Sequence, residues 1–271
     1  MDFPTLKLAR GIHVLHVFYR IQRTIWDRLP PEQSTAALGK LKKLLALNSH
    51  PCQPNLRSYL NLGGKADLAF WLRHADGFGL SQLHRDLENC FPSGVLAPVF
   101  SFLSLTELTE YQATEEDRRR HVAEADKLAP GTPEFDQRLA EVAARQQHYE
   151  QFRLYPEMED WEVMAFYPMN KRRSGADNWY LLEHAARKQL MAGHARVGRK
   201  YAGRISQLIT GSTGLDDWEW GVTLLARKLD DLKEIVHEMR FDEVSARYGE
   251  FGPFYVNIRL SPAQIWHHLR L

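Results

Sequence analysis

An order of expected strands and helices that occurs twice along the chain constrains its fold more than any other feature. In the first half, apolar residues that alternate or recur at helical spacing predict strand, helix, strand, strand, helix and strand. The Gly63-Gly64 pair joins the second and third strands and suits the positive φ angles of a tight hairpin. The expected elements are strand 11–20, helix 31–47, strands 56–62 and 66–72, helix 80–90 and strand 96–105.

The same order returns in the second half of the chain. The expected elements there are strand 162–169, helix 182–201, strands 205–210 and 219–226, helix 229–239 and strand 254–260, with GSTG at 211–214 as a hairpin turn. A repeated architecture of this kind is what a duplicated ferredoxin-like unit gives. Identity between the halves is slight, so the repeat is one of pattern. We expect an α+β fold with an N-terminal domain over 1–112 and a C-terminal domain over 153–271.

The segment 113–152 links these two halves and is dense in charged residues and alanine. Leucine, valine and tyrosine recur in it at helical intervals, and PGTP at 130–133 interrupts the pattern. This favours a helical linker of two solvent-facing helices. A disordered linker is the alternative, because highly charged segments often bury too little apolar surface to fold.

Composition sets looser limits. The 271 residues carry a formal net charge of +1, which gives no electrostatic footprint for nucleic acid or an anionic membrane. Cys52 and Cys90 show no metal-type spacing, and no CxxCH motif for covalent haem attachment is present, so no disulfide framework is expected. The N-terminal sequence lacks an apolar signal core, and no run reaches the roughly 18 apolar residues of a membrane span. A cytoplasmic location is therefore the default expectation.

The strand that begins at Val163 brings a phenol and an amine to one face. Because side chains alternate along a strand, Tyr167 and Lys171 lie on this face, while Met164 and Phe166 lie on the other. The alternative to a shared site is a core tyrosine beside a solvated lysine. Pro168 cannot donate to a strand ladder, which predicts a sheet edge or a strand end at that point. The first face holds Val163, Ala165, Tyr167, Met169 and Lys171.

His194 lies on the expected helix 182–201 among residues with small side chains. Gly193 and Ala195 flank it, and the low bulk would let a flat macrocycle approach the helix. Imidazole is a common protein ligand of haem iron. A purely structural histidine is the alternative.

Gln207 is the one amide on an otherwise apolar strand face, between Ile205 and Ile209. A buried amide needs hydrogen-bond partners. A structural hydrogen bond to a loop and a role beside a bound ligand both remain open.

Several motifs resemble the chlorite dismutase superfamily and, within it, the coproheme decarboxylases, which are also called peroxide-dependent haem synthases. The resemblance is dense from 153 to 256 and weaker in the N-terminal half, where FSFLSLTELTEY and the strand order carry it. The sequence departs from the commoner pattern at Gly193, Ala195 and Arg204, which puts the tuning of the iron in doubt. The motifs are RLYP, FYPMNKRR with NWYLL, LMAGHARVGRKYAG, SQLITGSTGLDDWEWGVTL and MRFDEVSARYGEFGPF.

This resemblance implies two tandem ferredoxin-like domains whose antiparallel sheets form a β-barrel flanked by helices, assembled as a homopentamer, with the porphyrin site in the C-terminal domain. By motif position, His194 would be the iron ligand and Tyr167 the radical-forming catalytic residue. Lys171 would be the cation beside the reacting propionate, and Gln207 the residue on the other side of the iron. Contacts to the macrocycle or its propionates would come from Arg153, Met169, Arg240 and Ser245.

The implied activity is hydrogen-peroxide-dependent oxidative decarboxylation of two propionates of Fe-coproporphyrin III (coproheme) to give haem b. The porphyrin would be substrate and redox cofactor at once, and transient contact with a ferrochelatase would supply it. Chlorite dismutation and a haem carrier or sensor role are the alternatives. Gln207 argues against the first, since chlorite enzymes of this superfamily carry an arginine there with a fixed charge. Tyr167 and Lys171 argue against the second.

Overall fold

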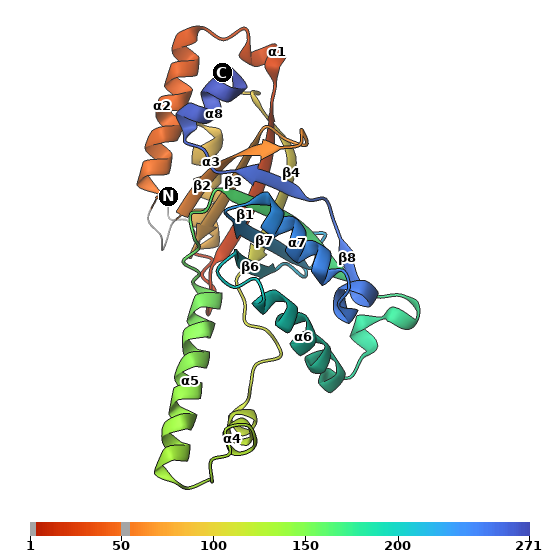
Figure 1. Ribbon diagram of the computed structural model, residues 1–271. Coiled ribbons are helices and arrows are strands. Elements are labelled where there is room, and N and C mark those ends of the chain that lie inside the picture. The colour runs from red at the N-terminus through yellow and green to blue at the C-terminus, as the bar shows by residue number, and fades with distance from the viewer. Residues whose placement is uncertain (1–3, 50–54) are drawn as a thin grey trace.

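The computed structural model describes residues 4–49 and 55–271. In these residues the strands form one nine-stranded sheet, with helices packed around it (Figure 1). The strands are β1 (His13–Ile21), β2 (Asn55–Leu62), β3 (Leu68–His74), β4 (Leu96–Leu105), β5 (Val163–Lys171), β6 (Ile205–Gly211), β7 (Trp220–Ala226), β8 (Gly249–Phe251) and β9 (Tyr255–Ile258). The α-helices are α1 (Arg23–Trp26), α2 (Pro31–Leu47), α3 (Gly77–Glu88), α4 (Glu115–Glu124), α5 (Pro133–Leu154), α6 (His184–Arg199), α7 (Leu229–Met239) and α8 (Pro262–Leu269).

The expected order of elements is confirmed in both halves, with ends that differ by a few residues. Gly63 and Gly64 both have positive φ in the turn between β2 and β3, as the hairpin prediction requires. Six short elements of the described residues were not predicted, because each is too brief to show a clear period of its own. These are α1, α8, β8, the 3₁₀ helices Gly175–Asp177 and Trp179–Leu181, and the π-helix Val244–Tyr248.

The sheet joins the two halves of the chain. Its strand order is β7-β6-β4-β1-β3-β2-β9-β5-β8, and every pairing between its strands is antiparallel. β9 bridges the halves by pairing with both β2 and β5. β5 also pairs with β7, the strand at the other end of that order. This additional pairing is one that the expected barrel requires; the barrel itself stays a prediction.

Each sheet face buries its own core because successive side chains point to opposite sides. One face gathers residues from both halves, including Phe18, Phe102 and Phe166. On the other face, α2, α3 and α8 cover the N-terminal strands, while Tyr167, Val222 and Leu224 belong to a separate C-terminal cluster. Each fully buried Phe or Leu stabilises the fold by roughly 1.5 to 3 kcal/mol. The predicted division of β5 into two faces is thus confirmed.

The charged linker forms two helices, so the prediction of α4 and α5 is confirmed and the disordered alternative is wrong. Thr114 caps α4 in a capping box with Asp117. The Thr132 hydroxyl caps α5 by accepting from the Phe135 backbone N–H. Such caps satisfy amides that a helix end leaves without partners. The pair projects away from the sheet (Figure 1). Lys188 of α6 donates to Asp117 at 2.7 Å, which ties α4 to the C-terminal half.

The prediction that Pro168 lies at an edge or strand end is wrong. It lies inside β5, which pairs with β7 on one side and with β9 and then β8 on the other. Pro168 stands where that second side changes partner, between the Phe166 pairing with β9 and the Met169 pairing with β8. A residue without an N–H is tolerated at such an interruption of the ladder.

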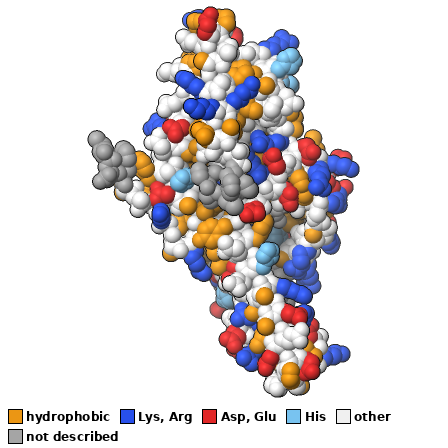
Figure 2. All heavy atoms as spheres, turned by 90° about the vertical axis from the view of Figure 1, so that its left-hand side faces the viewer, with side chains coloured by type: hydrophobic (Ala, Val, Ile, Leu, Met, Phe, Trp, Pro, Cys, Tyr) orange, Lys and Arg blue, Asp and Glu red, His pale blue; other side chains and the backbone are white. Residues whose placement is uncertain are grey.

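The surface agrees with the near-zero net charge. On the face that Figure 2 shows, basic and acidic side chains are interspersed, and neither sign covers it alone. Within 4–49 and 55–271, no helix combines the length and apolar character needed to cross a membrane. Cys90 is buried with a free thiol, and Cys52 lies outside the described residues.

Candidate active site

Tyr167 is buried on the face of β5 that carries the C-terminal cluster, with 6% of its surface exposed. Its ring stacks on Phe254 at 4.3 Å between centroids, and Phe251 lies at 5.9 Å. Burial raises the pKa of its phenol, and the nearby Arg240 guanidinium opposes this only in part. Among the described residues, none forms a hydrogen bond with the hydroxyl. The phenol therefore keeps its proton at neutral pH, and its hydroxyl can still form a hydrogen bond with a ligand.

Lys171 ends the same strand and is also buried, with 8% exposed. Its Nζ lies 4.6 Å from the centroid of the Trp179 ring. Burial lowers the pKa of the ammonium from 10.5 to about 8, although Asp242 and Glu219 act in the opposite direction. The alternative of a solvated surface lysine is wrong. In the part of the chain that the structure describes, no carboxylate is in direct contact with Nζ, and a buried cation in that state is costly.

Gln207 lies on the same sheet face as Tyr167, in the neighbouring row of paired residues. The pairing places Gln207, Leu224 and Ala165 side by side, and the next row holds Ile209, Val222 and Tyr167. Gln207 is half-buried. Its amide makes no hydrogen bond within the part of the chain that the structure describes, so the structural bond to a loop is not found.

His194 lies on α6 and is oriented by a carboxylate. Its Nδ1 lies 3.1 Å from Oδ2 of Asp242. With Nδ1 protonated, the ring donates to Asp242 and directs the lone pair of Nε2 outward, the arrangement that orients a metal-binding histidine. Nε2 has no protein partner among the described residues.

Asp242 is a site residue that the sequence analysis missed. Its Oδ1 accepts from the backbone N–H groups of Val244 and Ser245, which fixes the carboxylate at the start of the π-helix. Burial acts to raise its pKa, but the interactions with His194 and Ser245 outweigh this and lower it. The signal was present in MRFDEVS, where a carboxylate precedes the expected contact residue Ser245.

The four expected contact residues lie at different parts of this region. Met169 packs in the same apolar cluster as Tyr167, and the exposed Arg240 lies 3.9 Å from the centroid of Phe251. Ser245 joins the site through Asp242. Arg153, near the end of α5, donates to the Ile209 carbonyl at 3.1 Å, and its Nε is buried without a partner among the described residues.

These residues fit a carboxylated iron porphyrin. α6 packs against α7 and the π-helix, and none of its side chains is fully buried. Ile205 and Ile209 on the facing strand are only partly buried. His194 Nε2 could serve as a ligand atom, and Lys171, Arg240 and Arg153 are cations that could pair with carboxylates.

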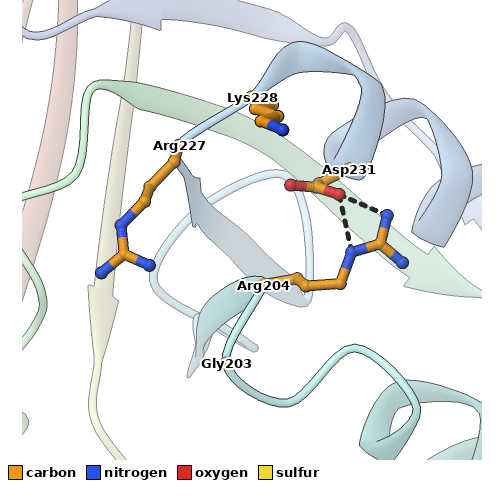
Figure 3. Close-up of a pocket in the computed structure, with 5 residues that line it drawn as sticks. All are labelled: Gly203, Arg204, Arg227, Lys228 and Asp231. Atoms are coloured by element: carbon orange, nitrogen blue, oxygen red, sulfur yellow. Dashed lines mark hydrogen bonds and ion pairs between the residues drawn. The ribbon is translucent and has the colours of Figure 1, made fainter.

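A separate hollow of about 320 Å³ lies at the turn before β6 and the start of α7 (Figure 3). Gly203, Arg204, Arg227, Lys228 and Asp231 line it. Arg204 donates to Asp231 through Nε at 2.7 Å and also pairs with Glu234. The replacement noted at Arg204 thus serves an ion-pair network. In the described part of the chain, no group of three or more His, Cys, Asp or Glu could hold a metal ion together.

Comparison with known proteins agrees with the resemblance at the family level. A family model described as chlorite dismutase matches residues 34–260. The chain belongs to the chlorite dismutase family. A structure described as that of a novel heme-binding protein from Thermus thermophilus is 36% identical, with a TM-score of 0.78 over 100% of this chain and 99% of that one.

Two mutant chlorite dismutases from Candidatus Nitrospira defluvii share the family fold with this chain. They are 16% and 20% identical, each with a TM-score of 0.70 over 97% of this chain and 98% of theirs. The coarse α+β prediction, a large antiparallel sheet with helices, is therefore confirmed.

Proposed function

We propose that this family member is a coproheme decarboxylase, which converts two propionates of Fe-coproporphyrin III to vinyl groups and so forms haem b. The observation that carries the proposal is the burial of Tyr167 and Lys171 on one strand face. Among the described residues, the Tyr167 hydroxyl has no hydrogen-bond partner and the Lys171 ammonium, which lies over the Trp179 ring, has no carboxylate in direct contact. A reacting propionate would complete both environments.

His194 would hold the iron through Nε2, while Asp242 fixes the ring orientation and strengthens the ligand. When bound, the iron porphyrin supplies, together with hydrogen peroxide, the oxidising power for the reaction. The Thermus thermophilus neighbour is described as heme-binding, which supports a porphyrin ligand for this chain as well.

Tyr167 would carry the oxidation to the substrate. Because its pKa is raised by burial, the phenol keeps its proton until it is oxidised and then loses an electron and a proton together. The resulting radical takes a hydrogen atom from the β-carbon of a propionate. That carbon loses a second electron while its neighbour releases carbon dioxide. In balance, one propionate, one hydrogen peroxide and one proton give one vinyl group, one carbon dioxide and two waters.

Lys171 would position that propionate. With a pKa of about 8, it is mainly an ammonium at neutral pH and can pair with the carboxylate. Such pairing holds the β-carbon near the phenol oxygen, and about 1 Å of misplacement can cost on the order of a hundredfold in rate.

The test follows the masses of the porphyrin. Ferric coproporphyrin III is added to the protein, peroxide is titrated, and two successive losses of a formic acid equivalent are expected. His194→Ala should lose the histidine-ligated ferric spectrum, whereas His184→Ala, on the same helix, should keep it. Chlorite breakdown without mass loss would indicate a dismutase. Porphyrin binding without either reaction would indicate a carrier or sensor.

The remaining parts of the proposal concern the surroundings of the enzyme. We expect a homopentamer in the cytoplasm, with a ferrochelatase as the transient donor of coproheme. Mass photometry tests the first of these directly, since each added subunit changes the particle mass by 31.4 kDa.

A further inference from the structure

Glu219 is a buried carboxylate beside the proposed porphyrin site. It immediately precedes β7, and only 5% of its surface is exposed. Its Oε2 accepts from the Lys171 backbone N–H at 2.9 Å, and its Oε1 accepts from the Tyr180 hydroxyl at 2.6 Å. Arg173 lies 3.8 Å from Oε1. The carboxylate thus contacts the end of β5 and the segment that follows it.

That segment, residues 172–182, carries the aromatic wall of the Lys171 site. Its two 3₁₀ helices have three residues each and contribute few hydrogen bonds of their own. Trp179 is buried against Lys171. The segment is held by the Arg172 N–H, which donates to the Tyr248 carbonyl, and by the Trp179 N–H, which donates to the Arg172 carbonyl. Two of its side chains reach Glu219 next to β7: the Tyr180 hydroxyl donates to it at 2.6 Å, and Arg173 pairs with it at 3.8 Å.

The strand pairing does not need this carboxylate. β5 and β7 already pair through Met169 and Trp220, and the Glu219 backbone N–H donates to the Asn170 side chain at 2.8 Å. A buried carboxylate is costly unless its charge and hydrogen bonds are used. Here Oε1 contacts the segment through Tyr180 and Arg173, Oε2 accepts from the Lys171 backbone N–H, and the charge acts on Lys171.

We propose that Glu219 is a positioning residue of the porphyrin site, which holds segment 172–182 closed over Lys171 and places a negative charge at the backbone of this lysine, where it favours an ammonium that can pair with a substrate carboxylate. This inference rests on the proposed function for the identity of that carboxylate. The charged groups that act on Lys171 are Asp242, from the segment after α7, and Glu219, just before β7. The Trp179 ring covers the ammonium.

Two variants separate the tether from the charge. Glu219→Gln removes the charge and leaves one acceptor oxygen for two donors. Tyr180→Phe removes only the tether and, because Tyr180 is exposed, leaves the core unchanged. Glu234→Gln is the matched control, since it makes the same chemical change at an exposed carboxylate that pairs with Arg204.

The first readout is hydrogen exchange of the porphyrin-free protein. Both Glu219→Gln and Tyr180→Phe should speed exchange in segment 172–182 by about fivefold to tenfold, the effect of one lost hydrogen bond. Glu234→Gln should leave it unchanged. Wild-type exchange in Tyr180→Phe would overturn the tether, even if Glu219→Gln does not fold.

The second readout is the titration of Lys171, followed by competitive amine labelling of the porphyrin-free protein and by the alkaline limb of decarboxylation. Removing a nearby negative charge disfavours the ammonium, so Glu219→Gln should shift both to lower pH by about half a unit or more. Tyr180→Phe and Glu234→Gln should leave the limb in place. A wild-type titration in Glu219→Gln would overturn the charge role. If the wild-type protein does not decarboxylate coproheme, the proposed function fails, while exchange and labelling still decide the role of Glu219.

Discussion

His194 and Asp242 form a histidine–carboxylate pair, with Nδ1 and Oδ2 3.1 Å apart. The same carboxylate accepts from the Val244 and Ser245 amides, so the ring is anchored to the π-helix. The pair joins two elements, α6 and the segment after α7.

Asp242→Asn should weaken porphyrin binding. The amide oxygen can take the place of Oδ1 and accept from the two backbone N–H groups, but the amide NH2 then replaces Oδ2. An NH2 group cannot accept from the imidazole N–H, so the ring loses its orienting bond and the ligand nitrogen becomes less basic. The loss of affinity for ferric coproporphyrin III should be about 10- to 100-fold in a spectral titration. Asp230→Asn, an exposed change on α7, is the control. Equal affinities for the wild type and Asp242→Asn would show that this carboxylate does not support the ligand.

Lys171→Met should stabilise the porphyrin-free protein at pH 7. The folded-state pKa of about 8 lies below the usual 10.5, so folding disfavours the ammonium, and stability is lost as pH falls from about 10.5 to about 8. Methionine removes that cost, which is about 1 to 3 kcal/mol. Urea unfolding should show the gain at pH 7 and its decline above pH 8. The exposed Lys228→Met should change little, and a destabilised Lys171→Met protein would contradict the buried-cation account.

Alternation along β5 was enough to predict that Tyr167 and Lys171 share a face, because period-two geometry is local. The burial of Lys171 could not be predicted this way, since Trp179 covers it from a segment too short to show a period. Asp242 was missed for a related reason. Its partner His194 is 48 residues away, and only the packing of α6 against the π-helix brings them together.

Gln207→Ala should keep measurable decarboxylation, because a neutral amide orients peroxide but is a poor general base. Its stability should stay within about 0.5 kcal/mol of the wild type, since the amide makes no hydrogen bond among the described residues. Porphyrin mass loss after peroxide addition measures decarboxylation by Gln207→Ala.

Gln207→Arg should raise chlorite breakdown from near zero by adding a fixed charge on that face. Oxygen release from chlorite measures the effect of Gln207→Arg. Wild-type chlorite turnover at the level of dedicated dismutases would refute the decarboxylase proposal.

Tyr167→Phe tests the central claim most directly. The variant keeps the ring stacked on Phe254 and loses a hydroxyl that no described residue bonds, so stability should change by less than about 0.5 kcal/mol and coproheme should still bind. The measurement is the mass of the porphyrin over time after peroxide addition. We predict that the wild type loses two formic acid equivalents and forms haem b, while the mass in Tyr167→Phe stays that of coproheme. Haem b formation by Tyr167→Phe at the wild-type rate would contradict the account.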